Sequence, residues 1–508
     1  MHADNSSRLM AQIAPTSKSI LMPENPNILF VMCDQLRADF LSMYGCAAIS
    51  TPNLDALSEQ STIYSNAISP YPLCVPARAA LLTGLNPLQS GVLTNHQWLR
   101  TDRSTIGYKT WPDLLRTKGY RTASIGKMHF HPFEAAEGFD ERIIAEDKRW
   151  PKVHDDYAEF LAQSGRKKFD ARTHPDYKKN KGSVVYPDTV ETTVDHFVAN
   201  ETIEFIQRQP EGRSFAVMVG FPSPHCPYDA LPEFANTVDT EKLPELIHRS
   251  AQPTQEEESF YQNFLENHRK DWHSLDYEEF TLAQRLSIRK QYAGLIKQID
   301  EEFGRIVQAC KDKGVWENTL VVFTSDHGDH VGDRSMVGKG DFYQESIHIP
   351  LIVKAADQQT SSRVDAPVEL QQVAATLLES SGSMIPAWWH YTPLPLSDRP
   401  DVTRDIFGIL GNGCMVQRGS WKFVSYQLGL TELFNLDEDP TETTNLADHP
   451  EYLEIRLKLE ASVRKWLMQS ALSGHHEKQL THGIALCESD SFAQRGWERN
   501  YPLPLPPQ

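Results

Sequence analysis

Short runs of consecutive apolar residues recur along the chain and predict buried strands. Three of them lie at residues 27–32, 215–221 and 319–324. A run of this length that is apolar at nearly every position is typical of a strand covered on both faces, as in a parallel sheet. Each run leads into polar or ionisable residues, and ligands bind at the carboxyl ends of strands in open α/β sheets. We therefore expect these strand ends to meet at one sheet edge and to carry the chemistry.

Between these runs, apolar positions recur at the spacing of amphipathic helices. The longest helix is predicted at residues 286–313, where apolar side chains return every three or four residues and Gly314 follows as a stop. Shorter helices are predicted at 51–60, which a Thr-Pro pair opens, and at 77–83. Strands that alternate with helices predict an α/β fold whose large central sheet is mostly parallel and flanked by helices.

The pattern changes after the apolar residues 350–353 and in two internal stretches. Short strands near 406–410 and 421–425, followed by a helix near 451–470, predict a smaller C-terminal α+β subdomain with an antiparallel sheet. Stretches rich in charged residues, His and Tyr are expected to be insertions over the sheet edge. The expected parts are an N-terminal arm at 1–26, the catalytic α/β domain at 27–390 with insertions at about 141–190 and 227–285, the subdomain at 391–470, and an extended Pro-rich tail at 471–508.

Composition and charge narrow the class of protein. The chain has 508 residues, 40% of them hydrophobic, which is enough for a large core. A net charge of −18 argues against a nucleic-acid partner, because phosphates need a basic surface. The same charge predicts repulsion of anionic substrates unless cationic groups gather locally. No apolar stretch approaches the roughly 20 residues of a membrane helix, so we expect no membrane partner.

The cysteines and the N-terminal residues indicate the compartment. Seven cysteines without a C-x-x-C pair fit neither a disulfide framework nor a zinc ribbon and suggest a reducing environment. The first residues lack the apolar region of roughly 7–15 residues that a signal peptide needs. We therefore expect a cytoplasmic protein, with a periplasmic location open if the natural N-terminus differs.

One cysteine stands in a motif of its own. The segment L-C-V-P-A-R-A-A-L-L-T-G places Cys74 just before a predicted helix, with Pro76 two residues later and Arg78 four residues later. Taken alone, the motif allows two interpretations. Cys74 is either a small buried thiol at a turn or a nucleophile activated by Arg78 and the helix N-terminus.

The segment is similar to the C-x-P-x-R signature of type I sulfatases, which belong to the alkaline phosphatase superfamily. Further segments resemble that family in its own order along the chain. They are N-I-L-F-V-M-C-D-Q (27–35), G-K-M-H (126–129), P-S-P-H-C-P-Y (222–228), S-D-H-G-D-H-V-G-D (325–333), V-G-K-G (337–340) and E-L-F-N-L-D (432–437). The Asp-Gln and Asp-His pairs resemble the choline sulfatase, arylsulfatase and phosphonate monoester hydrolase branches. The resemblance implies an alkaline phosphatase-like fold.

The resemblance also implies a metal-dependent sulfatase. In that family the cysteine matched by Cys74 is converted to formylglycine, whose hydrated aldehyde attacks the sulfur of a sulfate monoester. Carboxylate and amide oxygens suit Ca²⁺, whereas an imidazole nitrogen shifts the preference toward Mn²⁺. The implied metal ligands are Asp34, Gln35, Cys74, Asp326 and His327.

A set of cationic and ionisable residues completes the implied site, because fixed positive charge stabilises the charge that builds during S–O cleavage. By resemblance, Arg78 orients the diol, while Lys127 and Lys339 bind sulfate oxygens. His225 and Lys339 protonate or stabilise the leaving group, and His129 is the base that expels sulfate. The implied catalytic residues are Cys74, Arg78, Lys127, His129, His225 and Lys339, with Asn95 as a substrate-binding residue.

Two other functions remain open from the sequence. A phosphonate monoester hydrolase or phosphodiesterase would use the same nucleophile, but the G-K-M-H segment favours sulfate because the phosphonate branch lacks Lys and His there. A non-catalytic anion- or metal-binding protein would result if Cys74 were never converted. The expected partners are a small-molecule or saccharide sulfate ester and a formylglycine-generating enzyme. The apolar residues of the tail predict a homo-oligomer, a dimer or a tetramer.

Overall fold

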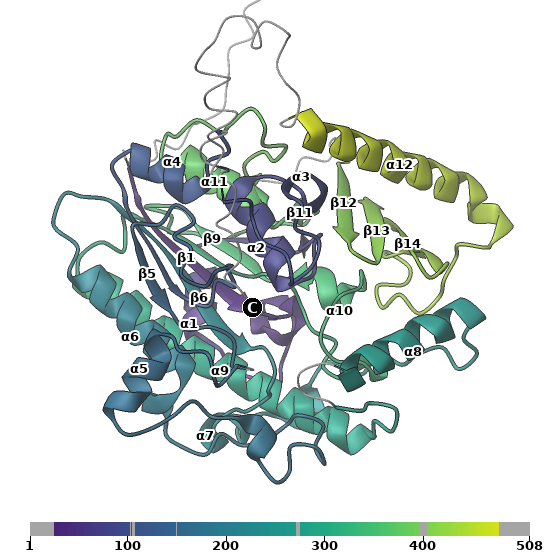
Figure 1. The fold of residues 1–508 in the computed structure, drawn as a ribbon, viewed down its shortest axis with the longest axis horizontal. Helices are drawn as coiled ribbons and strands as arrows, with labels where there is room; N and C mark the ends of the chain where they lie inside the picture. The colour runs from purple at the N-terminus through teal and green to yellow at the C-terminus, as the bar shows by residue number, and fades with distance from the viewer. Residues whose placement is uncertain are drawn as a thin grey trace, which may run out of the picture.

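The computed structural model describes residues 25–476, apart from 102, 104–106, 149, 271–274 and 396–403, with side chains described up to Leu472. Eight strands form its central sheet: β1 (Asn27–Asp34), β2 (Thr62–Tyr64), β4 (Arg121–Gly126), β5 (Glu141–Ile144), β6 (Phe215–Pro224), β7 (Thr319–Ser325), β9 (Leu351–Lys354) and β10 (Ser362–Val364). Their order is β10-β2-β9-β7-β1-β6-β4-β5. Five of the seven pairs are parallel, and the two that β9 makes are antiparallel. The predicted, mostly parallel central sheet is confirmed (Figure 1).

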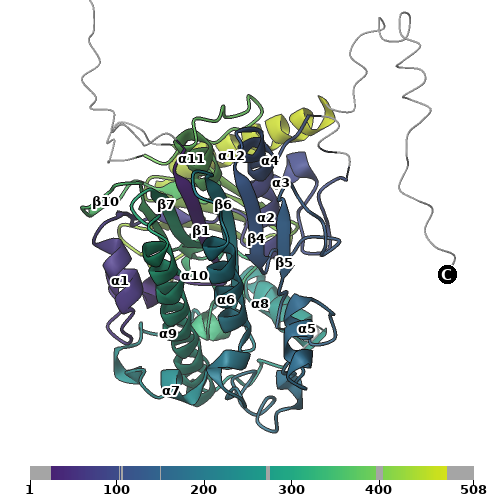
Figure 2. The same ribbon diagram turned by 90° about the vertical axis from the view of Figure 1, so that its left-hand side faces the viewer.

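Helices cover both faces of this sheet (Figure 2). The helices on one face are α1 (Pro52–Ser58), α6 (Val194–Gln207) and α9 (Leu282–Asp312), and those on the other are α2 (Cys74–Thr83), α4 (Trp111–Thr117) and α11 (Gln372–Ser380). Successive residues of β1 pack into the two cores in turn: Val31 lies in the first and Phe30 in the second. A strand buried on both faces is apolar at every position, which explains the continuous runs in the sequence.

The C-terminal subdomain is a separate antiparallel sheet with a helix against it. Its strands are β12 (Asp405–Leu410), β13 (Gly413–Arg418), β14 (Trp421–Tyr426) and β15 (Thr431–Asn435), in sequential order. The helix α12 (Leu453–His476) buries Leu459 and Val463 against Val416, Phe423 and Leu433 of this sheet. The predicted small antiparallel subdomain is therefore confirmed.

Short elements connect these parts. A three-stranded sheet joins β11 (Val368–Glu369), β3 (Ala67–Ile68) and β8 (His348–Ile349). The remaining α-helices are α3 (Pro87–Ser90), α5 (Asp156–Gln163), α7 (Pro232–Ala235), α8 (Gln255–Lys270) and α10 (Gln344–Ile347). Across the described ranges, no helix combines the length and the apolar character that crossing a bilayer requires.

Three segments differ from the expected elements. The helix expected at 77–83 begins at Cys74, because Pro76 lies in the first turn, where no helical N–H bond is lost. Residues 141–144, expected within an insertion, form the edge strand β5 beside β4. This strand is only half-buried, so polar residues interrupt its apolar pattern. Residues 471–476, expected to begin the extended tail, instead continue α12, because the helix does not end at 470. The remainder of the predicted tail, from 477 to 508, and residues 1–24 of the predicted arm at 1–26 lie outside the described residues.

Candidate active site

The carboxyl ends of the neighbouring strands β1 and β7 bring two polar pairs together. Asp34 is the last residue of β1, and Asp326 follows β7, which pairs in parallel with β1. The backbone N–H of Gln35 donates to Asp326 Oδ1 over 3.1 Å. Gln35 holds a left-handed backbone at φ 73°, a conformation that costs free energy for a side chain with a Cβ and persists where its surroundings enforce it.

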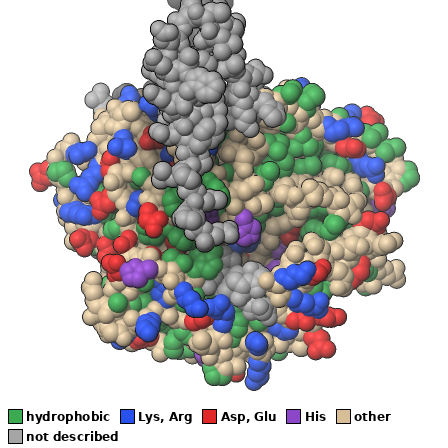
Figure 3. Space-filling model, viewed as in Figure 1, with side chains coloured by type: hydrophobic (Ala, Val, Ile, Leu, Met, Phe, Trp, Pro, Cys, Tyr) green, Lys and Arg blue, Asp and Glu red, His purple; other side chains and the backbone are tan. Residues whose placement is uncertain are grey.

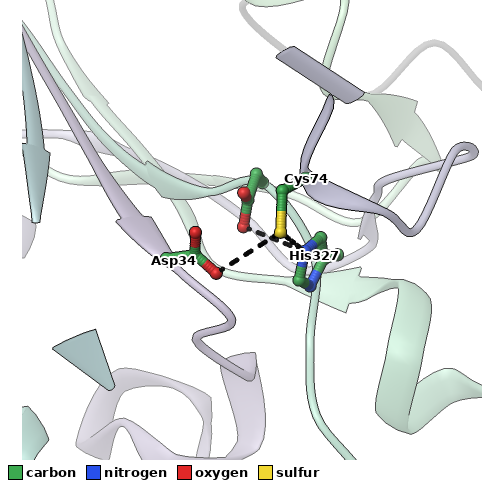
Figure 4. Close-up of side chains that lie close together, drawn as sticks. Asp34, Cys74 and His327 are labelled. Carbon is green, nitrogen blue, oxygen red and sulfur yellow. Dashed lines mark hydrogen bonds and ion pairs between the residues drawn. The ribbon is translucent and has the colours of Figure 1, made fainter. Parts of the chain in front are cut away.

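Cys74 lies against both pairs from the opposite side. It is the first residue of α2 and is completely buried. Its Sγ is 3.3 Å from His327 Nε2 and 3.8 Å from Asp34 Oδ1, and Figure 4 shows the three side chains pointing toward one another. One ligand atom from each of Asp34, Cys74, Asp326 and His327 lies within 4.8 Å of all the others. Four of the five sequence-predicted ligands therefore converge on a volume that one cation would fill, and the amide of the fifth, Gln35, contacts Lys339 and Asp329.

The electrostatics of this cluster suit a divalent cation. Burial, and then the neighbouring Asp34, raise the pKa of Asp326, as expected for two like charges in a dry site. Burial lowers the pKa of His327, but Asp326 and Cys74 together outweigh it and the net shift is upward. A cation bound between the two carboxylates would remove their repulsion. Two carboxylates, an amide oxygen and an imidazole thus make a donor set that fits Ca²⁺ or Mn²⁺.

Arg78 binds both metal-ligand carboxylates from one turn further along α2. Its guanidinium contacts Asp326 Oδ2 at 2.9 Å and Asp34 Oδ2 at 3.2 Å. A third bond, to the backbone oxygen of Lys127 at 2.6 Å, ties the end of β4 to the same group. Burial would lower the pKa of Arg78, yet the two aspartates raise it, so the guanidinium stays charged.

Lys127 follows β4 and is fully buried between two carboxylates. Its Nζ lies 2.7 Å from Asp34 Oδ2 and 2.6 Å from Asp147 Oδ2. Burial would raise the pKa of Asp34, but Lys127, then His225 and Arg78, hold it well below its usual 3.8. Asp34 is therefore ionised and able to bind a cation.

His225 and Lys339 face the cluster from two different segments. His225 follows β6, and its Nε2 lies 2.8 Å from Lys339 Nζ and 4.0 Å from Asp34 Oδ1. Lys339 also donates to Gln35 Oε1 over 2.5 Å. The structure thus joins the family-like segments 222–228, 337–340 and 27–35, which supply His225, Lys339 and Gln35.

The charges around Cys74 lower the pKa of its thiol. Burial, and then Asp34, oppose ionisation, but Lys339, Lys127 and His327 together lower the pKa of Cys74 from 9.0 to about 6. An unconverted Cys74 is therefore a thiolate at neutral pH. The site stabilises negative charge at this position, where an attacking oxygen or a bound sulfate oxygen would also lie.

His129 and Asn95 lie at the border of the cluster. The backbone N–H of His129 donates to Glu146 Oε1 over 3.1 Å, and its ring packs edge-on against Trp150 at 5.1 Å. These contacts are with the segment after β5, so the proton-transfer role of His129 stays a prediction. Asn95 Oδ1 accepts from the backbone N–H of Val75, which places Asn95 at the first turn of α2 beside Cys74.

Three acidic residues of the site are absent from the sequence-based set. Glu146 and Asp147 come just after β5, much as Asp34 ends β1, but this short half-buried strand has no continuous apolar run and lay within the expected insertion. Asp329 lies inside the quoted S-D-H-G-D segment without an assigned role. All three carboxylates are buried, and burial raises the pKa of Glu146.

A cavity of about 180 Å³ opens beside the cluster. Gln35, Asn95, His225 and Lys339 line its inner side. Tyr177, Lys181, His268, Leu275 and Tyr277 are among the residues that line the rest. Aromatic and apolar walls that lead to a polar end are typical of sites that bind the organic part of a substrate.

The site combines carboxylates that suit a divalent cation with fixed cations that suit an oxyanion. Both groups lie at the carboxyl edge of one α/β sheet. This arrangement defines a hydrolase of anionic esters.

Comparison with known proteins gives the family. The Sulfatase family profile matches residues 26–383. An arylsulfatase of Clostridium perfringens is 28% identical over 469 residues, covering 84% of this chain and 92% of that protein. A choline-sulfatase of Rhizobium meliloti is 28% identical over 463 residues, covering 84% and 83%. The phosphonate monoester hydrolase of Agrobacterium radiobacter shares the fold with a TM-score of 0.74 at 22% identity, covering 88% of this chain and 96% of that one.

The chain belongs to the sulfatase family of the alkaline phosphatase superfamily and is a sulfuric ester hydrolase.

Proposed function

We propose that the protein hydrolyses a sulfate monoester by S–O cleavage, using a formylglycine made from Cys74. The convergence of Asp34, His327 and Lys127 around the fully buried Cys74 supports this proposal most strongly. Membership of the sulfatase family implies formylglycine and a divalent metal. When formed, the hydrated aldehyde supplies an oxygen nucleophile in place of the thiol.

Asp34, Asp326 and His327, with Gln35 and the converted Cys74, would hold the cation. When bound, the cation polarises the sulfate oxygens and lowers the pKa of the nucleophile hydroxyl. The metal identity is open between Ca²⁺, which the oxygen ligands favour, and Mn²⁺, which the imidazole of His327 favours.

Arg78 and Lys127 orient the attacking group and one face of the sulfate. Arg78 remains charged, and its bonds to Asp34 and Asp326 fix the guanidinium beside the first residue of α2. Lys127 is fixed by Asp34 and Asp147, so its ammonium does not have to reorganise when charge develops on a sulfate oxygen. Such preorganised charge is the largest contribution to catalysis in many hydrolases.

His225 and Lys339 act on the leaving oxygen. Their side chains lie 2.8 Å apart and line the cavity that would hold the alcohol part of the substrate. A proton donated by this pair neutralises the alkoxide as the S–O bond breaks. His129 is proposed as the base for the return step that releases sulfate.

The substrate is proposed to be a small-molecule or saccharide sulfate ester. Phosphonate monoester hydrolysis is the alternative, and the likeness of fold to a phosphonate monoester hydrolase is the observation behind it. Lys127 and His129 favour sulfate by the resemblance of the G-K-M-H segment. We further propose a cytoplasmic homo-oligomer whose Cys74 is converted by a formylglycine-generating enzyme.

Mass spectrometry of the Cys74 peptide, together with an activity panel on protein from the native host, tests this function. The expected peptide carries an aldehyde, with an oxygen in place of the sulfur and two hydrogens fewer. The panel contains 4-nitrophenyl sulfate, choline sulfate, sulfated mono- and disaccharides and a phosphonate monoester. An intact thiol with full sulfatase activity would overturn the mechanism, and faster turnover of the phosphonate would establish the alternative.

A further inference from the structure

Asp329 is a fully buried carboxylate at the centre of a hydrogen-bond network beside the proposed metal site. Its Oδ2 accepts from the side-chain amide of Gln35 and from the hydroxyl of Tyr228 at 2.8 Å. Its Oδ1 accepts from the backbone N–H of Val331 at 2.9 Å and from that of Gly338 at 2.6 Å. Four donors from four different positions of the chain therefore meet on one carboxylate.

The network determines which end of the Gln35 amide faces the cation. All four neighbours of Asp329 donate hydrogen bonds to it, so its oxygens accept, and Gln35 presents the Nε2 end of its amide there. An ammonium only donates, so Lys339 binds the Oε1 end. A metal requires an oxygen lone pair, and an amide that turned over would offer it N–H groups instead. Asp329 therefore favours the orientation in which Gln35 can be a ligand.

The same carboxylate holds the turn that carries Lys339. Gly338, bound through its backbone N–H, directly precedes this lysine. Tyr228 lies three residues after His225, so the hydroxyl bond also ties Asp329 to the segment that supplies this histidine. A single group thus fixes the amide of Gln35 and the two segments that act on the leaving oxygen.

We infer that Asp329 is a positioning residue that sets the Gln35 amide with its oxygen toward the cation and fixes the Lys339 turn. The inference rests on the proposed function, because it takes Gln35 as a metal ligand. Residues that orient a metal ligand typically contribute about 10–100-fold to metal affinity.

Variants that exchange the hydrogen-bond donor and acceptor between Gln35 and Asp329 provide the test. In Asp329→Asn, the two backbone N–H groups of Val331 and Gly338 retain the asparagine oxygen at the Oδ1 position. The asparagine then presents its NH₂ to Gln35, which turns its own oxygen toward that NH₂ and away from the cation. In the double variant Gln35→Glu with Asp329→Asn, the NH₂ instead binds a glutamate, and either glutamate oxygen can face the cation.

The measurements are Mn²⁺ and Ca²⁺ binding to metal-stripped full-length protein by titration calorimetry, and kcat and KM for 4-nitrophenyl sulfate with saturating metal. We expect Asp329→Asn to weaken metal binding about 10–100-fold and the double variant to recover at least tenfold of that loss. Asp341→Asn is the matched control. Asp341 is a buried carboxylate in the same segment that pairs with His330 at 2.7 Å, and its loss is expected to lower stability without changing metal affinity.

Wild-type affinity in Asp329→Asn, or a double variant that binds no better than Asp329→Asn, would overturn the inference. Gln35→Ala separates this failure from a failure of the proposed function. If Gln35→Ala binds both metals as tightly as the wild type, Gln35 is not a ligand and the inference is wrong with it. If the wild type binds neither metal, the proposed metal site itself is wrong. If Gln35→Ala weakens binding and Asp329→Asn does not, the inference alone is overturned.

Discussion

Replacing Lys127 with methionine removes one charge from the driest part of the site and keeps most of the side-chain volume. Lys127 is completely buried, with Nζ 2.7 Å from Asp34 and 2.6 Å from Asp147. The substitution leaves both carboxylates without this cation, and breaking a buried ion pair costs about 3–5 kcal/mol of stability. Removing one preorganised group from an oxyanion site lowers kcat by about 10²–10³-fold.

The assay is steady-state kinetics with 4-nitrophenyl sulfate, alongside urea unfolding of the same samples. Lys422→Met is the matched control, because Lys422 is also fully buried, pairs with Glu442 and binds the backbone oxygen of Phe342 in the C-terminal subdomain contact. We expect both variants to lose stability and only Lys127→Met to lose kcat. A kcat for Lys127→Met within about threefold of the wild type, or an equal loss in Lys422→Met, would refute the reasoning.

Three further predictions concern Cys74, the metal site and a buried glutamate, Glu369. Cys74→Ser is expected to reduce sulfatase activity to background. Cys414 is half-buried in β13, so the control variant Cys414→Ser is expected to retain sulfatase activity. Sulfatase activity in Cys74→Ser would contradict the nucleophile assignment. Chelation of the metal is expected to abolish activity and to lower the melting temperature, because the repulsion between Asp34 and Asp326 returns, and added Mn²⁺ or Ca²⁺ should restore both. Unchanged activity after exhaustive chelation would exclude a required metal. Burial raises the pKa of Glu369 from 4.5 to about 7 despite Arg404 at 3.1 Å, so between these pH values the folded protein binds a proton that the unfolded chain has lost, and stability falls as pH rises from about 4.5 through about 7. Glu369→Gln should flatten this pH dependence of the denaturation midpoint, and an unchanged slope would disprove the assignment.

The sequence predicted the sites that lie directly after buried strands. Asp34 and Asp326 follow continuous apolar runs, and such runs identify both a strand and its end. Asp147 follows β5 in the same way, but this edge strand is half-buried and reads E-R-I-I, so no apolar run marked it. A continuous apolar run identifies a strand that is buried on both faces, and an edge strand that is only half-buried lacks such a run.

The role of Asp329 depends on partners that sequence order conceals. Its contact with Gln35 spans 294 residues, and its contact with Tyr228 spans 101. Only the pairing of β1 with β7 brings the first two together. The start of α2 at Cys74 was missed for a different reason, since a proline three residues into a segment suits either a turn or a first helical turn.

The opposition between net charge and site charge also has a structural basis. On the face drawn in Figure 3, acidic and basic side chains are interspersed, whereas Arg78, Lys127 and Lys339 are gathered around Cys74. The net charge of −18 is spread over the whole molecule, and charges beyond about 10 Å are screened at physiological salt. The local field around Cys74 therefore decides which anion binds there.

The burial of Cys74 limits when it can be modified. The folded protein leaves its sulfur with no exposed surface, and His327, 3.3 Å from that sulfur, lies 253 residues further along the chain. At about 5–20 residues per second, about 10–50 s separate the synthesis of these two residues on the ribosome. Under the proposed conversion, the modifying enzyme has to act within that interval or on an unfolded chain. Folding and modification then compete in time, and the fraction of converted protein, measured by mass spectrometry, should rise when translation is slowed.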